Sequence, residues 1–215
     1  MLPVFITGIG TGIGKTIVAA IVTEALKADY WKPVQSGMDE GTDSLQIQQL
    51  ISNPVSVIHK EAYALQLPAS PHIAAREENI KIDLNLIAQK LNEIKEKSDK
   101  KILVIEGAGG IMVPLNENEF ILDLIEKIQC KVILVSRNYL GSINHSLLTA
   151  AVCKQKNLDV AGWIFNDQYL NYEEEIEKWT CFCKIASIPN AESIDKTFIK
   201  HQADKIAVAL AESLS

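Results

Sequence analysis

The chain has 215 residues, of which 47 % are hydrophobic and 22 % are charged, and its formal net charge is −6. This length and composition allow one globular domain with a sizeable core. The acidic balance argues against nucleic acid or an anionic membrane as the main partner, because both bind basic surfaces. The first residues lack the basic segment of a signal peptide, and no apolar run is long enough to span a bilayer. Since the four cysteines also indicate no disulfide framework, we expect a cytoplasmic protein.

Apolar runs of strand length alternate along the chain with helical patterns. We predict strands over 2–7, 30–34, 101–106, 131–136, 160–165 and 185–188. We predict helices over 15–28, 83–97, 120–129, 142–157 and 195–214, with Asp83 as an N-cap. The apolar runs are nearly continuous, which suits strands that are buried on both faces. The pattern predicts a single α/β domain over 1–215, with a mainly parallel sheet and helices on both faces.

The stretch TGIGTGIGKT, residues 7–16, lies between the first predicted strand and the first predicted helix. Glycines there bring backbone N–H groups close to an anion, and the helix N-terminus adds positive potential. Lys15 would then reach the β- and γ-phosphates of a nucleotide, and the Thr16 hydroxyl would bind Mg²⁺. The usual spacing G-x4-G-K-[ST] is not met, because Ile9 stands where the first glycine belongs. A glycine-rich turn without a ligand is the alternative, but the strand–loop–helix context favours a phosphate loop.

An acidic residue ends the predicted strand in ILVIEGAGG, residues 102–110. A carboxylate at the C-terminal end of a central strand, next to a phosphate loop, is a typical Mg²⁺ ligand. Glu106 is the candidate, and the glycines after it would leave room for substrate. The alternative is an acid that caps a strand end.

Two further candidates follow the second predicted strand. Lys32 in WKPVQSG is a second lysine near the same sheet edge, which indicates a second anion or charge that develops during transfer. By itself the motif also fits a surface lysine before a turn. Asp43 in GTDSLQ is either a second magnesium carboxylate or a helix N-cap.

Three motifs in the second half are weaker signals. LGSINHSLLTA, residues 140–150, opens a predicted helix whose free N–H groups could bind a carboxylate or phosphate, and its lone His145 suggests packing rather than catalysis. Asn166 in GWIFND could read the N6 and N7 edge of adenine, or occupy a turn. Cys181 and Cys183 form a C-x-C pair without a second pair, so free, partly buried thiols are favoured over a metal site.

In this order the motifs resemble the dethiobiotin synthetases, the ATP-dependent carboxylases of biotin synthesis. The matching stretches lie between residues 7 and 167, and the tail matches poorly apart from IP at 188–189. They are TG with GKT, KPVQSG, Asp43, SPHIA at 70–74, EGAGG, VP at 113–114, LGSINHSLLTA and AGWIFND. The resemblance implies a P-loop NTPase-like fold. It also implies carboxylation of 7,8-diaminononanoate with CO2, phosphorylation of the carbamate by ATP, and ring closure to dethiobiotin, ADP and phosphate.

The resemblance also assigns roles by position. The implied nucleotide contacts are Gly12, Ile13, Gly14, Lys15, Thr16, Ile17, Asp43, Glu106, Gly107, Ala108, Gly109, Asn166 and Pro189. The implied Mg²⁺ ligands are Thr16, Asp43 and Glu106, and the implied catalytic residues are Lys32, Lys15, Thr11 and Ser36. The implied substrate contacts are Thr11, Lys32, Ser36 and Gly109, with Gly141, Ser142, Ile143 and Asn144 for the tail carboxylate. In the family that last turn comes from the neighbouring subunit, which implies a homodimer.

The phosphate loop departs from the family pattern T-G-T-D-T-x-V-G-K-T, in which x is often Glu. Gly10 replaces the aspartate and Gly12 the glutamate. Backbone binding of phosphate survives this loss, but any orienting role of the two acids does not. We therefore expect looser nucleotide binding than in relatives that carry the acids.

Three other functions would suit parts of the pattern. A ParA/MinD-like ATPase switch shares the fold, but its additional loop lysine would stand at Gly10, and KPVQSG would have no purpose there. A ligase that amidates another carboxylate would need an ammonia source, for which this length leaves no room. A nucleotide-binding scaffold without turnover is the third alternative.

Overall fold

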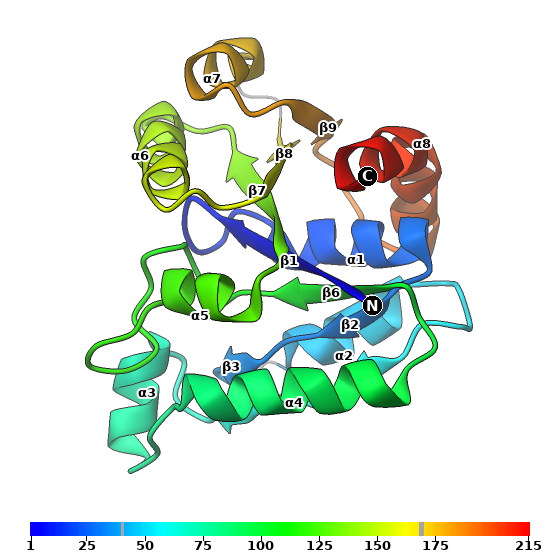
Figure 1. The fold of residues 1–215 in the computed structure, drawn as a ribbon. Coiled ribbons are helices and arrows are strands. Elements are labelled where there is room, and N and C mark those ends of the chain that lie inside the picture. Colours follow the sequence, from blue (N-terminus) through cyan, green and yellow to red (C-terminus); the bar gives the residue numbers. More distant parts are fainter. Residues whose placement is uncertain (40, 168–169) are drawn as a thin grey trace.

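The computed structural model describes residues 1–39, 41–167 and 170–215, and these form an α/β fold (Figure 1). The strands are β1 Leu2–Gly8, β2 Asp29–Trp31, β3 Val34–Ser36, β4 Ile58–His59, β5 Tyr63–Leu65, β6 Ile102–Glu106, β7 Lys131–Arg137, β8 Val160–Asn166 and β9 Lys184–Ile188. The helices are α1 Lys15–Leu26, α2 Asp43–Leu50, α3 Pro71–Glu77, α4 Leu84–Lys97, α5 Ile121–Ile128, α6 Ser142–Gln155, α7 Glu173–Thr180 and α8 Lys196–Leu214.

Within the described residues, seven strands form one sheet in the order β4-β2-β6-β1-β7-β8-β9, and every pairing in it is parallel. A separate parallel pair joins β3 to β5. Because β1 lies between β6 and β7, the loop that follows β1 emerges beside the last residue of β6, with Ile6 in register with Glu106. The C-terminal ends of the strands therefore gather the predicted motifs at one edge, as the fold class requires.

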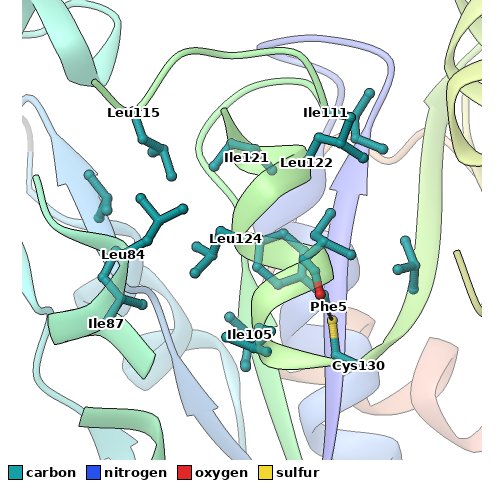
Figure 2. Packing of buried hydrophobic residues seen from close by; sticks show 14 of the residues in the cluster. Phe5, Leu84, Ile87, Ile105, Ile111, Leu115, Ile121, Leu122, Leu124 and Cys130 are labelled. Atoms are coloured by element: carbon teal, nitrogen blue, oxygen red, sulfur yellow. Dashed lines mark hydrogen bonds between the residues drawn. The ribbon is translucent and has the colours of Figure 1, made fainter. Parts of the chain in front are cut away.

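Both faces of the sheet are buried by helices. Phe5 of β1 and Ile105 of β6 pack in one core with Leu84 of α4 and Leu124 of α5, as Figure 2 shows. The alternate residues of β1, Val4 and Ile6, pack in a second core with residues of α1 and α8. In Figure 1, α1 and α8 lie on one side of β1 and α5 lies on the other. The predicted fold class and its mainly parallel sheet are thereby confirmed.

The sequence misplaced several elements. The strand predicted over 30–34 is two strands, because Pro33 has no N–H to donate, so β2 ends at Trp31 and β3 turns to pair with β5. No prediction covered α2, α3, α7, β4 or β5. Apart from that split strand, the predicted elements exist with bounds shifted by at most two residues. Asp83 caps α4, as predicted, through a hydrogen bond that its side chain accepts from Asn85 N.

All four cysteines are free, and Cys130 and Cys153 are buried. Cys181 and Cys183 are exposed rather than partly buried, because the chain turns at the end of α7 with Cys181 in a left-handed conformation. Across the described residues, no helix combines the length and the apolar character needed to cross a membrane.

Candidate active site

The loop between β1 and α1 has the backbone of a phosphate loop. Gly12 and Gly14 have φ of 70° and 85°, and Gly14 is the N-cap of α1. A Cβ on Gly14 would lie 2.5 Å from Nδ2 of Asn166, so both conformation and space require glycine there. Asn166 in turn donates from Nδ2 to the carbonyl of Ile13 at 2.7 Å. A hydrogen bond from the last residue of β8 thus holds the loop in place.

Lys15 lies inside this loop. Its ammonium donates to the carbonyl of Gly10 at 2.7 Å, and the side chain is buried. Burial lowers the pKa of Lys15 to about 8, although the Glu106 carboxylate opposes the shift. The loop therefore holds a cation with little water around it, which strengthens its attraction for an anion.

Three oxygen-bearing side chains meet beside the loop, from α1, α2 and the end of β6. The Thr16 hydroxyl lies 3.0 Å from Asp43 Oδ1 and 2.9 Å from Glu106 Oε1. One hydroxyl proton can serve only one of these two carboxylate oxygens at a time. The cluster is therefore a set of hard oxygen donors that suits Mg²⁺. The N-cap of α2 is Thr42, and Asp43 is the first residue of the helix, so the alternative role of Asp43 as an N-cap is wrong.

Lys32 stands between the two carboxylates. Its ammonium lies 2.5 Å from Asp43 Oδ2 and 3.2 Å from Glu106 Oε1, and its side chain is 6 % exposed. Burial lowers the pKa of Lys32, but the two carboxylates more than offset this, so the pKa is raised above its ordinary value. Lys32 is thus a fixed cation and not the surface lysine that the motif also allowed.

These groups surround a cavity of about 720 Å³. The predicted site residues that line it are Thr11, Gly12, Gly14, Lys15, Thr16, Ile17, Lys32, Ser36, Asp43, Glu106, Ala108 and Gly109. The hydroxyl oxygen of Ser36 is buried, and in the described part of the chain it has no hydrogen-bond partner. An unpaired buried hydroxyl in a cavity wall is unfavourable unless a ligand pairs with it.

The remaining predicted residues lie outside this cavity. Ile13 is buried beneath the loop, and Gly107 packs against the ring of Phe5. Pro189 lines a separate cavity of about 590 Å³, together with Asp167. The turn formed by Gly141, Ser142, Ile143 and Asn144 opens α6 and does not line the phosphate-loop cavity.

Sequence reasoning missed two residues that form hydrogen bonds with Glu106 or Asp43. Tyr30 donates its hydroxyl to Glu106 Oε2 at 2.8 Å. Gln35 accepts from the backbone N–H of Asp43 at 3.3 Å and donates to the carbonyl of Gly37 at 3.0 Å. Tyr30 gave no signal because tyrosine is an ordinary strand residue. Gln35 lies within KPVQSG, but the residues predicted from that motif are Lys32 and Ser36.

Fold and site together define a P-loop nucleotide-binding protein. Solved structures agree in fold. MinD of Pyrococcus horikoshii in complex with Mg-ADP matches with a TM-score of 0.63 at 17 % identity, covering 100 % of this chain and 96 % of that one. MinD in the MinC:MinD complex of Aquifex aeolicus matches with a TM-score of 0.62 at 14 % identity, covering 100 % of this chain and 96 % of that one.

Sequence comparison gives the particular family. The family model described as an AAA domain matches residues 3–197. The ATP-dependent dethiobiotin synthetase BioD of Christiangramia forsetii is 47 % identical over 97 % of each chain, and that of Cytophaga hutchinsonii is 46 % identical over 94 % of this chain and 95 % of the relative. The chain belongs to the ATP-dependent dethiobiotin synthetase family.

Proposed function

We propose that this protein converts 7,8-diaminononanoate, CO2 and ATP to dethiobiotin, ADP and phosphate in the cytoplasm. One amine adds to CO2 and loses a proton, which forms a carbamate. The carbamate takes the γ-phosphoryl group of ATP. The second amine then attacks the carbamoyl carbon, and the cyclic urea forms as phosphate leaves. The observation that carries the proposal is the convergence of Lys15, Lys32, Asp43 and Glu106 on one cavity that also contains the unpaired Ser36 hydroxyl.

The two lysines suit the two anions of this reaction. Lys15 and the loop N–H groups would bind the β- and γ-phosphates at the N-terminus of α1. Lys32, which is charged and buried, would hold the carbamate and the transferring phosphoryl group. Preorganised charges of this kind stabilise developing negative charge without reorganisation. Positioning and electrostatics then supply most of the catalysis, as in phosphoryl transfer generally.

The oxygen cluster fits the magnesium ion that such reactions use. Thr16, Asp43 and Glu106 would hold it, since all three are hard oxygen ligands and the Thr16 hydroxyl lies within 3.0 Å of an oxygen of each carboxylate. When bound, Mg²⁺ neutralises charge on the phosphate oxygens. The same carboxylates keep Lys32 protonated, which couples the metal ligands to the carbamate site.

The diamine would occupy the part of the cavity beyond the loop. Ser36 offers its unpaired hydroxyl there, and Thr11 and Gly109 lie side by side, since a Cβ on Gly109 would be 3.3 Å from Thr11 Oγ1. Asn166 and Pro189 would flank the adenine. With Nδ2 already bonded to Ile13, Asn166 retains its oxygen and one N–H for the base.

The tail carboxylate would bind the turn that opens α6 in a second copy of the chain. Around this turn Leu140 is 89 % exposed and Leu148 of α6 is 58 % exposed. Two large apolar side chains exposed around the same turn support a surface that another chain covers. The proposed active unit is therefore a homodimer with the substrate site at its interface.

The test is phosphate release from Mg-ATP with bicarbonate, with and without 7,8-diaminononanoate, while mass spectrometry follows the cyclic urea. We expect release that depends on the diamine, with one urea formed for each phosphate. Phosphate release that ignores the diamine would contradict the proposal and indicate an ATPase switch of the kind whose fold the chain shares.

A further inference from the structure

Tyr30 is a buried strand residue that contributes one polar atom to the active site. It lies in β2, between β4 and β6, and its backbone is in register with both neighbours. The side chain is 0 % exposed, and its hydroxyl lies 2.8 Å from Glu106 Oε2. The two residues are 76 positions apart in sequence, so the sheet order alone brings them together.

The two oxygens of Glu106 have separate partners. Oε2 accepts from Tyr30, while Oε1 faces Thr16 and Lys32 at 2.9 and 3.2 Å. The Tyr30 hydroxyl is the donor of its hydrogen bond, and the Glu106 carboxylate oxygen is the acceptor. One carboxylate oxygen is thus held from inside the sheet, and the other is presented to the cavity.

We propose that Tyr30 is a positioning residue that orients the Glu106 carboxylate for its metal ligand role, an inference that rests on the proposed function. The terminal torsion of a glutamate is broad, so a carboxylate held at one end only would swing between orientations. A hydrogen bond from a residue locked in the sheet removes that freedom. Partners of this kind, one step behind the metal ligands, change metal affinity by about 10- to 100-fold when they are removed.

The direct test is the affinity of the full-length protein for Mn²⁺ in the presence of ADP, measured by calorimetry on wild type and Tyr30→Phe. We expect Tyr30→Phe to weaken Mn²⁺ binding about tenfold or more. The Mg²⁺ concentration for half-maximal turnover should rise by a similar factor, while ADP binding without metal stays unchanged. Unchanged Mn²⁺ affinity in a folded Tyr30→Phe protein would overturn the proposal.

Tyr63→Phe is the matched control. The Tyr63 hydroxyl also makes one hydrogen bond, accepting from Asp83 N at 2.9 Å, but it contacts neither carboxylate. We expect this variant to bind Mn²⁺ like wild type even if its melting temperature falls. An equal loss of Mn²⁺ affinity in both variants would show that Tyr30 acts through general stability, and would refute a positioning role.

A double-mutant cycle with Glu106→Gln separates this inference from the proposed function. If Tyr30 acts through Glu106, removing its hydroxyl in the Glu106→Gln background costs no further Mn²⁺ affinity. Additive losses would overturn the positioning role. If Glu106→Gln itself leaves Mn²⁺ binding unchanged, the metal role of Glu106 fails, and with it that part of the proposed function. If Tyr30→Phe alone does not fold, the double variant is compared with Glu106→Gln, and a further loss of Mn²⁺ affinity there would overturn the positioning role.

Discussion

The phosphate-loop cavity and the turn that opens α6 are built in opposite ways. In the cavity, the charges of Lys15, Lys32, Asp43 and Glu106 are buried or half-buried and face one another within a single chain. Around the turn, the apolar side chains of Leu140 and Leu148 are 89 % and 58 % exposed. One chain therefore completes the half of the proposed site that handles phosphate and metal. It leaves the proposed tail-carboxylate half for a second copy.

The difference follows from the cost of buried charge. An ammonium or carboxylate removed from water must be paired, and pairs hold their partners in place. The cavity is consequently preorganised before substrate arrives. The turn that opens α6 and the exposed apolar side chains around it bury no charge, so they need no charged partner within the same chain. Substitutions in the cavity should therefore change turnover at any protein concentration. The effect of substitutions around the turn should depend on protein concentration.

The largest effect is expected for Lys32→Ala. Loss of a preorganised cation at the transferring group should reduce turnover by about 10²- to 10³-fold, measured as diamine-dependent phosphate release. ATP binding measured by calorimetry should stay largely intact. Lys156→Ala is the control, since Lys156 pairs with Glu126 on the surface. Joint loss of turnover and ATP binding would assign Lys32 to nucleotide binding and refute this role.

A large effect on ATP binding is expected for Gly14→Ala. A left-handed backbone costs a residue with a Cβ about 1–2 kcal/mol, and here the Cβ would also meet Asn166. We expect ATP affinity to fall by about tenfold or more, since 1.4 kcal/mol is a factor of ten. Gly10→Ala is the matched control, because no described atom lies within 4 Å of its Cβ position. Equal affinities for the two variants would contradict this account of the loop.

An intermediate effect is expected for Leu148→Asp. A charge on the apolar face of α6 should weaken the proposed dimer by about 1–3 kcal/mol, as hot-spot losses at interfaces do. Sedimentation should show more monomer, and turnover per chain should fall on dilution, while ATP affinity stays unchanged. Val208→Asp is the control, because Val208 is 71 % exposed on α8, far in sequence from the turn. A monomer with full activity would refute the shared site.

The smallest effect is expected for Gly10→Asp, which restores one of the two loop acids. Gly10 has open space around its Cβ position, whereas Gly12 has a φ of 70° that would strain any replacement. If the missing acid loosens nucleotide binding, its return should lower the KM for ATP about two- to fivefold, the value of one modest polar contact. An unchanged KM would show that the loop backbone compensates for the acid.

Local sequence patterns predict part of the fold and part of the site. The strand over 2–7, the loop with Lys15 and Thr16, and the strand that ends at Glu106 were all predicted, because apolar runs and glycine spacing are local signals. The helices α2 and α7 were missed because their faces are mostly polar, and α2 buries only Ile47 and Leu50. Asp43 was assigned to the metal site through the resemblance, and the alternative of a helix N-cap was wrong by one residue, because Thr42 is the cap.

The sequence by itself determined the fold class, the position of the phosphate loop and the family, since these depend on periodicity and on residues close together in the chain. The tertiary structure decided that Lys32 lies between Asp43 and Glu106, that Tyr30 holds Glu106, and that the Ser36 hydroxyl is left unpaired. Lys32 and Glu106 are 74 residues apart, and they meet because β2 lies beside β6 in the sheet. Strand order is a property of the whole core, and no local pattern specifies it.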